Sequence, residues 1–367
     1  MSATESLRAW TRFLKRDVLA DLHGHVVNAL AAMSFAVAVA GHCQSGRVAC
    51  GVPLGRATPA SVRRRWERLL GNARLAPDAV FARLCRSLAA AWGGCGREVV
   101  IIVDETDRDA RLRSLRVCVG YRRRALPLLS LAYRPDAPPR PLPELLVRQL
   151  GRVRRWLGGA VEVTLLADRG LAWPQVVRAC QRWGWHYVLR AQKGTRVRLS
   201  GSDRDRALGD LAPRRRGGRP FVGRGRVFKG EGWIDGVSVT AVWERRCKEP
   251  WLLLGDRPGG YARCRQYARR MWCEQSFRDE KAQGFHWDAS RVDDPRRATR
   301  LLVLLALATL LCVATGVRVV KRGLRRSLDA HRARRWLSYF QLGLRWLRWA
   351  TQCERPIPLL GVSLVPP

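Results

Sequence analysis

Two aspartates follow apolar segments of the chain, and carboxylates at such positions can bind a metal ion. The apolar run 99–103 is followed by Asp104, and the run 161–167 is followed by Asp168. In open α/β sheets, ligands gather at the carboxyl ends of the strands. Two carboxylates on neighbouring strands would therefore converge on a hard divalent cation, which prefers oxygen ligands. Taken singly, each aspartate is equally typical of a turn that ends a strand, so the prediction depends on the pair.

A third carboxylate lies in the charged segment YARRMWCEQSFRDEK. Polar residues spaced by three, four and seven positions occur in it: Tyr267, Arg270, Glu274 and Lys281. At about 100° per residue, these offsets place the four side chains within an arc of roughly 60° on one helix face. Such a face predicts an anionic metal ligand among cations that bind phosphate. A solvated face of salt-bridged charges is the alternative.

The elements that must position these acids follow from the apolar pattern. Apolar runs, continuous or alternating, predict strands over 99–103, 115–121, 126–133, 161–167 and 186–190. Helices are expected before the fourth and the fifth strand, ending at Trp156 and spanning 173–183. Three strands, helix, strand, helix, strand is the order of the ribonuclease-H-like α/β fold. We therefore predict a catalytic core that begins over 96–192 and is completed over 260–350.

The first 95 residues (1–95) have the pattern of helices, and we expect them to bind DNA. Thr58 and Pro59 are typical of the N-cap and the first residue of a helix. The predicted helix carries Arg63, Arg64 and Arg65 beside apolar residues. A short helix, a turn with glycine and a basic amphipathic helix resemble a helix-turn-helix. A charged face that is merely solvated has the same pattern.

Residues 193–259 are rich in Gly and Arg and contain short alternating segments, which predict a β-rich insertion in the core. Its arginines suit phosphate contacts, with a disordered loop as the alternative. Trp233 is a candidate for stacking on a flipped base, by its location alone. Residues 351–367 are expected to form a tail.

The charge of the chain indicates a polyanionic partner. Lys and Arg number 68 against 30 for Asp and Glu, which gives a formal net charge of +38. Codon bias accounts for the choice of Arg over Lys better than for the size of this excess, so nucleic acid is the predicted partner. The 11 cysteines contain no CxxC pair, which favours reduced thiols over a zinc site.

Two apolar runs, 26–40 and 301–317, were compared with membrane segments. The second is at the lower limit of the length that spans a bilayer. Thr309 and Thr315 interrupt it and basic residues flank it, so a buried core helix is the prediction. We expect no membrane association, and a location in the cytoplasm on the nucleoid.

The chain resembles the bacterial insertion-sequence DDE transposases of family four, which are defined by the signature Y-(2)-R-(3)-E-(6)-K. Tyr267, Arg270, Glu274 and Lys281 match this spacing without a gap. Further similarity lies in VDETD around Asp104, in ADRG, in YVLRAQKGT and in SYFQLGLRWL. The resemblance extends from about residue 25 to about residue 350, and is weakest in the arginine-rich insertion.

The resemblance implies a metal-dependent nuclease and strand transferase. Its catalytic triad would be Asp104, Asp168 and Glu274, holding two Mg²⁺ ions for which Mn²⁺ may substitute, with Asp104 bridging them. Tyr267 and Arg270 would hold a phosphate beside an extruded nucleotide, and Lys281 another. The implied reaction is cut-and-paste transposition through a hairpin at the transposon end. Its partners would be double-stranded DNA, as terminal inverted repeats and target, and a second copy in a homodimer on DNA.

Two other functions fit the same pattern. One is a catalytically decayed or domesticated DNA-binding protein of this fold, against which the intact set of acids argues. The other is a structure-selective nuclease, which would need neither the helix-turn-helix-like start nor the long insertion.

Overall fold

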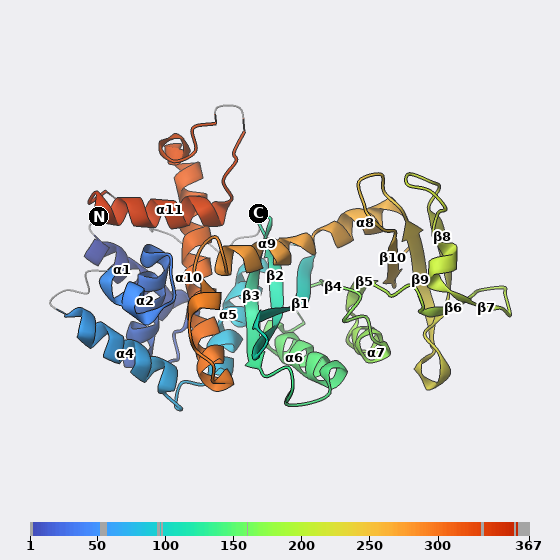
Figure 1. Ribbon diagram of the computed structural model, residues 1–367, viewed down its shortest axis with the longest axis horizontal. Coiled ribbons are helices and arrows are strands. Elements are labelled where there is room, and N and C mark those ends of the chain that lie inside the picture. Colours follow the sequence, from blue (N-terminus) through green and yellow to red (C-terminus); the bar gives the residue numbers. More distant parts are fainter. Residues whose placement is uncertain are drawn as a thin grey trace.

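The computed structural model describes residues 3–51, 57–93, 96, 98–159, 161–331, 334–355 and 357–358. The strands are β1 (Val99–Asp109), β2 (Leu112–Tyr121), β3 (Arg124–Tyr133), β4 (Val163–Ala167), β5 (His186–Arg190), β6 (Arg196–Leu199), β7 (Asp205–Ala207), β8 (Phe221–Val227), β9 (Ile234–Val242) and β10 (Trp251–Gly255). The helices are α1 (Ala3–Phe13), α2 (Gly24–Ala40), α3 (Ser45–Gly51), α4 (Pro59–Gly71), α5 (Pro77–Trp92), α6 (Leu142–Leu157), α7 (Pro174–Trp183), α8 (Tyr261–Ala268), α9 (Met271–Glu280), α10 (Pro295–Lys321) and α11 (Tyr339–Gln352). The molecule is elongated, with helices at one end, the sheet in the centre and the insertion at the other end (Figure 1).

The strands form a mixed sheet in the order β3-β2-β1-β4-β5-β10-β9-β8-β6-β7. Its first three strands are an antiparallel meander, as predicted. β4 is parallel to β1, and β5 is parallel to β4. This arrangement confirms the predicted order of elements and is the topology expected of a ribonuclease-H-like core.

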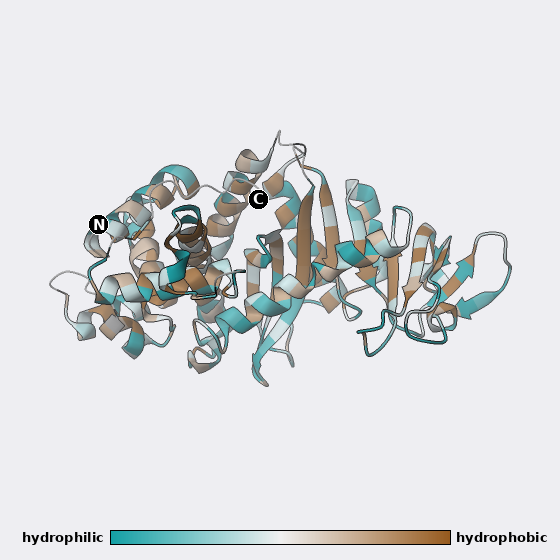
Figure 2. Ribbon diagram, turned by 90° about the horizontal axis from the view of Figure 1, so that it is seen from above, coloured by the Kyte–Doolittle hydropathy of each residue, from teal (hydrophilic) through white to brown (hydrophobic). Residues whose placement is uncertain are grey.

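The insertion extends the central sheet rather than forming a separate body. β10 pairs antiparallel with β5, and β9, β8, β6 and β7 follow outward. Four of its strands were predicted at nearly these positions, whereas the short β7 was missed. Its burial pattern has no buried residue, so there was no apolar signal to find. In Figure 2 the hydrophobic colour lies on the inner strands, and the outermost strands of the insertion are hydrophilic.

The two faces of the sheet are covered by different helices. Val99, Ile101 and Val103 of β1 join a core that includes α6 and α7. Val100 and Ile102 point the other way, into a smaller core with residues of α8 and α9. Because side chains alternate along a strand, the next even position, Asp104, faces α8 and α9. The alternation therefore fixes the layer in which a site at the end of β1 must lie.

α10 is the central helix of the helical end of the molecule. It is long and apolar enough to cross a membrane by length and composition, yet 78% of its most apolar stretch is buried within the protein. It packs on α2, α11 and the edge strand β3, as predicted for a core helix. Gly316 and Gly343 allow α10 and α11 to touch closely, since a Cβ at Gly316 would lie 1.8 Å from the Tyr339 carbonyl oxygen.

The N-terminal helices agree with the prediction in position and differ in one detail. The predicted helix over 7–22 is α1 followed by a π-helical segment, Leu14–Val18. Thr58 is the N-cap of α4, because its Oγ1 accepts a hydrogen bond of 3.2 Å from the Ser61 amide. The turn proposed between the two helices of the helix-turn-helix falls partly on 52–56, which lie outside the described residues.

Candidate active site

Asp104 and Asp168 lie side by side at the carboxyl ends of β1 and β4. The last pair in the parallel register of these strands is Val103 with Ala167, so each aspartate is the next residue after it. Asp104 is 14% exposed at its side chain and Asp168 is 30% exposed. Both carboxylates therefore border the solvent at one edge of the sheet, as the sequence predicted.

The segment that carries the third carboxylate is not one helix, which corrects the prediction. α8 ends at Ala268, and α9 begins at Met271. Between them the hydrogen bonds run from residue i to residue i−3: Arg270 N donates to Tyr267 O, and Cys273 N donates to Arg270 O. Such 3₁₀-like bonds tighten the turn to about three residues. The junction therefore rotates α9 relative to α8 and divides the predicted single face.

Three of the four signature residues nevertheless meet the strand-end aspartates. Arg270 Nη1 donates to Asp104 Oδ2 at 2.7 Å, and its Nη2 donates to Glu274 Oε1 at 3.1 Å. Nη2 also lies 3.9 Å from Asp168 Oδ2. Tyr267 Oη donates to Asp168 Oδ1 at 3.1 Å. The three acids thus surround one guanidinium, which is only 7% exposed.

The electrostatics of this cluster are those of carboxylates short of positive charge. Burial raises the pKa of Asp104 from 3.8 to about 6, and Glu274 and Asp168 raise it further against the pull of Arg270. Burial also raises the pKa of Asp168, but Arg270 and hydrogen bonds from the Arg169 amide and Tyr267 outweigh it, and the net shift is downward. The two aspartates therefore differ in proton affinity although they are neighbours.

The donor set fits a divalent metal ion in its chemistry. Three carboxylates provide oxygen ligands, which Mg²⁺ and Mn²⁺ prefer, and a cation already lies among them in the form of the Arg270 guanidinium. Among the residues that the structure describes, no three His, Cys, Asp or Glu side chains are close enough to hold a metal ion as they stand. Arg270 separates the acids, so a metal ion and this guanidinium would compete for the same carboxylates.

Lys281 is not part of this cluster. It is the C-cap of α9, and its ammonium donates to the backbone oxygen of Asp107, two residues before the end of β1. The ammonium also lies 5.9 Å from the centre of the Trp287 ring. Burial lowers the pKa of Lys281, and Arg116 lowers it further. Its predicted phosphate contact would need a strand that passes beyond the end of β1.

The other predicted DNA contacts lie away from the triad. Arg63, Arg64 and Arg65 are exposed on α4 in the helical end of the molecule. Trp233 directly precedes β9, which is separated from β4 by β5 and β10. Its ring is flanked by the guanidiniums of Arg198 at 5.7 Å and Arg226 at 5.5 Å. The structure thus does not bring Trp233 into contact with the acids.

Arg190 is a residue of the site that the sequence reasoning missed. It ends β5, the strand beside β4, and its Nη1 lies 4.0 Å from Asp168 Oδ1. Its Nη2 donates to Glu249 at 2.6 Å. The signal was present, because Arg190 follows an apolar strand just as Asp104 and Asp168 do.

The comparison with known families agrees with this geometry. A family model described as transposase DDE domain matches residues 78–311, which is more than half of the chain. The chain belongs to the transposase DDE domain family. A search of curated proteins found no match. The match begins in α5 and ends in α10, so it includes β1, β4, the insertion and α9. As a DDE transposase, the protein is an enzyme that acts on DNA.

Proposed function

We propose that this transposase moves an insertion sequence by cut-and-paste, using Asp104, Asp168 and Glu274 as its catalytic triad. The observation that supports the triad is the convergence of three carboxylates from β1, β4 and α9 on one guanidinium. We place the signature residues in the family-four type on their spacing. The first and second parts of the core would be 96–192 and 260–350, with 193–259 as the insertion.

The residues of the site divide the work of the proposed reaction. Tyr267 orients Asp168 through its hydrogen bond, which leaves Oδ2 of that carboxylate available. Arg270 keeps the three acids together by partly neutralising them, and its cationic charge suits a scissile phosphate once the acids are otherwise compensated. When bound, two Mg²⁺ ions supply an activated water or 3′-hydroxyl and a counter-charge for the leaving oxygen.

DNA recognition is proposed for the helical region 1–95. The exposed arginines of α4 support this, because Arg63, Arg64 and Arg65 leave the apolar side of the helix to the core. Such arginines contact phosphates and set the position of the duplex. We propose that two copies act together, because two transposon ends must be cut in concert, and that they do so in the cytoplasm on the nucleoid.

The test is cleavage of a supercoiled plasmid that carries the DNA flanking the gene, with purified protein and Mg²⁺. Wild type is compared with Asp104→Ala and with Asp107→Ala, a matched control on the same strand whose side chain pairs only with Arg113. We expect breaks at fixed ends and hairpin products on denaturing gels for wild type and Asp107→Ala. Asp104→Ala should give none of these products while still binding the ends.

Each other outcome selects a different function. Binding without cleavage by folded wild-type protein would favour the decayed DNA-binding protein. Cleavage that follows DNA shape rather than the ends would favour a structure-selective nuclease. Equal cleavage by wild type and Asp104→Ala would overturn the proposed triad.

A further inference from the structure

An open groove of about 750 Å³ lies beside the junction of α8 and α9, on the same face of the sheet as the triad. It is bordered by the β2–β3 turn and by the segment that precedes α11. We call it the arginine groove after its lining arginines, Arg122, Arg123, Arg124, Arg265, Arg269 and Arg335. Ala268 and Arg269 in its wall directly connect Tyr267 to Arg270. A ligand in this groove would therefore lie next to the candidate active site.

The arginine groove has positive charge that the protein does not compensate. No carboxylate is among the residues that line it. Arg124 is paired with Asp279, whereas Arg123, Arg265 and Arg269 are exposed and, within the described residues, have neither an ion pair nor a side-chain hydrogen bond. Uncompensated guanidiniums in a concave site attract phosphate. The ligand is thus expected to be a polyanion.

The turn at the edge of the groove is strained in a way that its own stability does not require. β2 and β3 are joined by two residues, Arg122 and Arg123, with φ of 48° and 66°. A turn with two positive φ angles favours Asn-Gly, because a side chain larger than that of Gly is disfavoured there. Two arginines at these positions point to a use for their side chains, since strain of this kind concentrates at functional sites.

An exposed indole completes the groove. Trp336 is 69% exposed, more than any other large hydrophobic residue that the structure describes. Its ring stacks on His331 at 5.3 Å, and the Asp329 carboxylate accepts hydrogen bonds from the amides of Trp336 and Leu337. The indole is therefore held in place rather than free. A held and solvated aromatic ring offers a π face to a ligand.

We propose that the arginine groove binds an unpaired DNA strand, with its guanidiniums on the phosphates and Trp336 stacked on a base. Cations that follow a backbone together with an aromatic ring are the means by which single strands are bound without sequence preference. In a duplex the bases are stacked on one another, so Trp336 would have no base to receive. The inference rests on the proposed function, in which a strand end leaves the duplex near the triad.

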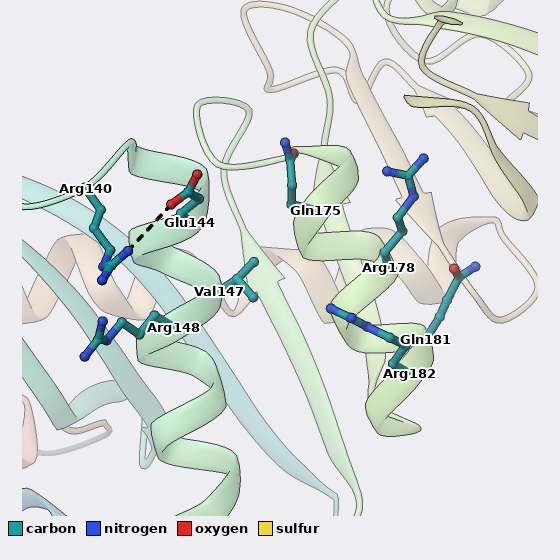
Figure 3. A pocket seen from close by; sticks show the side chains of 8 residues that line it. All are labelled: Arg140, Glu144, Val147, Arg148, Gln175, Arg178, Gln181 and Arg182. Carbon is teal, nitrogen blue, oxygen red and sulfur yellow. Dashed lines mark ion pairs between the residues drawn. The ribbon is translucent and has the colours of Figure 1, made fainter. Parts of the chain in front are cut away.

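A matched set of cations lies on the opposite face of the sheet and serves as a control. The groove between α6 and α7 is lined by Arg140, Arg148, Arg178 and Arg182 (Figure 3). Arg140 is paired there with Glu144, and Arg178 donates to the Glu231 carbonyl. No aromatic residue lines this groove. Arg148→Ala/Arg182→Ala removes the same charge as Arg265→Ala/Arg269→Ala without touching the proposed site.

The experiment measures fluorescence anisotropy of a labelled oligothymidylate of about 12 nucleotides and of a duplex of equal length, in EDTA. Trp336→Ala should weaken single-strand binding by about 5- to 150-fold, the effect of losing one stacked base, and leave duplex binding nearly unchanged. Arg265→Ala/Arg269→Ala should weaken single-strand binding and lower its salt dependence by about 1.4, or 0.7 for each phosphate contact. The α6–α7 control should do neither.

The strained turn gives an independent readout. Arg122→Asn/Arg123→Gly should raise the thermal midpoint, because it relieves the positive φ angles, while it weakens single-strand binding. A merely structural turn would show the first change without the second, and that result would overturn the role of the turn.

Several results would overturn the proposal as a whole. They are unchanged single-strand affinity in Trp336→Ala, equal losses for both forms of DNA, and a loss in the α6–α7 control as large as in the groove variant. Because EDTA removes cleavage from the assay, these results are independent of the plasmid test. Loss of plasmid cleavage with intact strand binding would sink the proposed catalysis alone, and the converse would sink the groove alone.

Discussion

The two ends of α9 hold clusters of arginine and carboxylate that have opposite characters. At the first end, three carboxylates share Arg270, and their side chains are 14%, 30% and 43% exposed for Asp104, Asp168 and Glu274. At the other end, Arg116 pairs with Glu280 and both side chains are almost completely buried. The first cluster is open and has an excess of negative charge. The second is sealed and balanced.

The balanced cluster holds α9 on the meander. Arg116 lies on β2 opposite Asp104 of β1 in the strand register, yet its guanidinium turns to Glu280. It is enclosed by the rings of Phe277 and Trp287, at 5.2 and 5.3 Å. Arg124 and Asp279 form a similar pair at 2.5 Å one strand further along. These pairs fix the helix that presents Glu274.

The difference between the clusters separates structural acids from functional ones. Each acid of the second cluster has its own guanidinium, so a metal ion would have nothing to neutralise there. The first cluster lacks positive charge and remains accessible, which are the conditions for binding a cation or a phosphate. Three changes test this contrast, and they are given from the largest expected effect to the smallest.

Glu280→Gln should destabilise the protein by about 3–5 kcal/mol, because it leaves the buried Arg116 without a counter-charge. Glu274→Gln is the matched control at the other end of α9. It should change the free energy of unfolding by less than about 1 kcal/mol, since its side chain is 43% exposed and shares its partner. Urea unfolding in the absence of metal measures both. Similar losses in the two variants would mean that the two clusters do not differ in kind.

Mg²⁺ should stabilise the open cluster and have no effect through the sealed one. A ligand at about 100 times its dissociation constant stabilises the folded state by roughly 2.7 kcal/mol. The thermal midpoint of wild type and of Glu280→Gln should therefore rise with Mg²⁺, and that of Asp104→Asn should not. In Arg270→Gln the rise should be larger than in wild type, because the competing guanidinium is gone. A smaller rise in Arg270→Gln would contradict competition between the guanidinium and the metal.

The contrast also shows what could be predicted from the sequence. The strands of the core and the place of Asp104 and Asp168 were predictable, because an apolar run that ends in an acid reports its own burial and its own end. The family membership confirms the class of enzyme. The sheet-extending role of the insertion was not predictable, since the pairing of β10 with β5 joins segments that are about 60 residues apart.

The partners of the acids were predictable only in part. Spacing singled out Glu274 over Asp279 and Glu280, and the structure separates them in the same way, because the latter two are buried in ion pairs. Their partners Arg116 and Arg124 lie more than 150 residues away in the chain, where no local pattern marks them. The departure of Lys281 from the cluster depends on the 3₁₀-like junction at Arg269 and Arg270, which helical spacing cannot reveal.

The smallest expected effect is a pH dependence of stability that arises from Asp104. Its pKa is about 6 in the folded protein against an ordinary value of 3.8, so between these values the folded state keeps a proton that the unfolded state has lost. The stabilisation from this proton is complete at low pH and is lost as the pH rises through about 6. Wild type should lose about 1 kcal/mol between about pH 5 and about pH 7 relative to Asp104→Asn, as measured by urea unfolding in EDTA. Asp168, whose pKa is lowered, contributes with the opposite sign but is present in both proteins, so the difference isolates Asp104. A difference of zero would mean that Arg270 compensates Asp104 fully, and the cluster would then have no deficit of positive charge for a metal ion to fill.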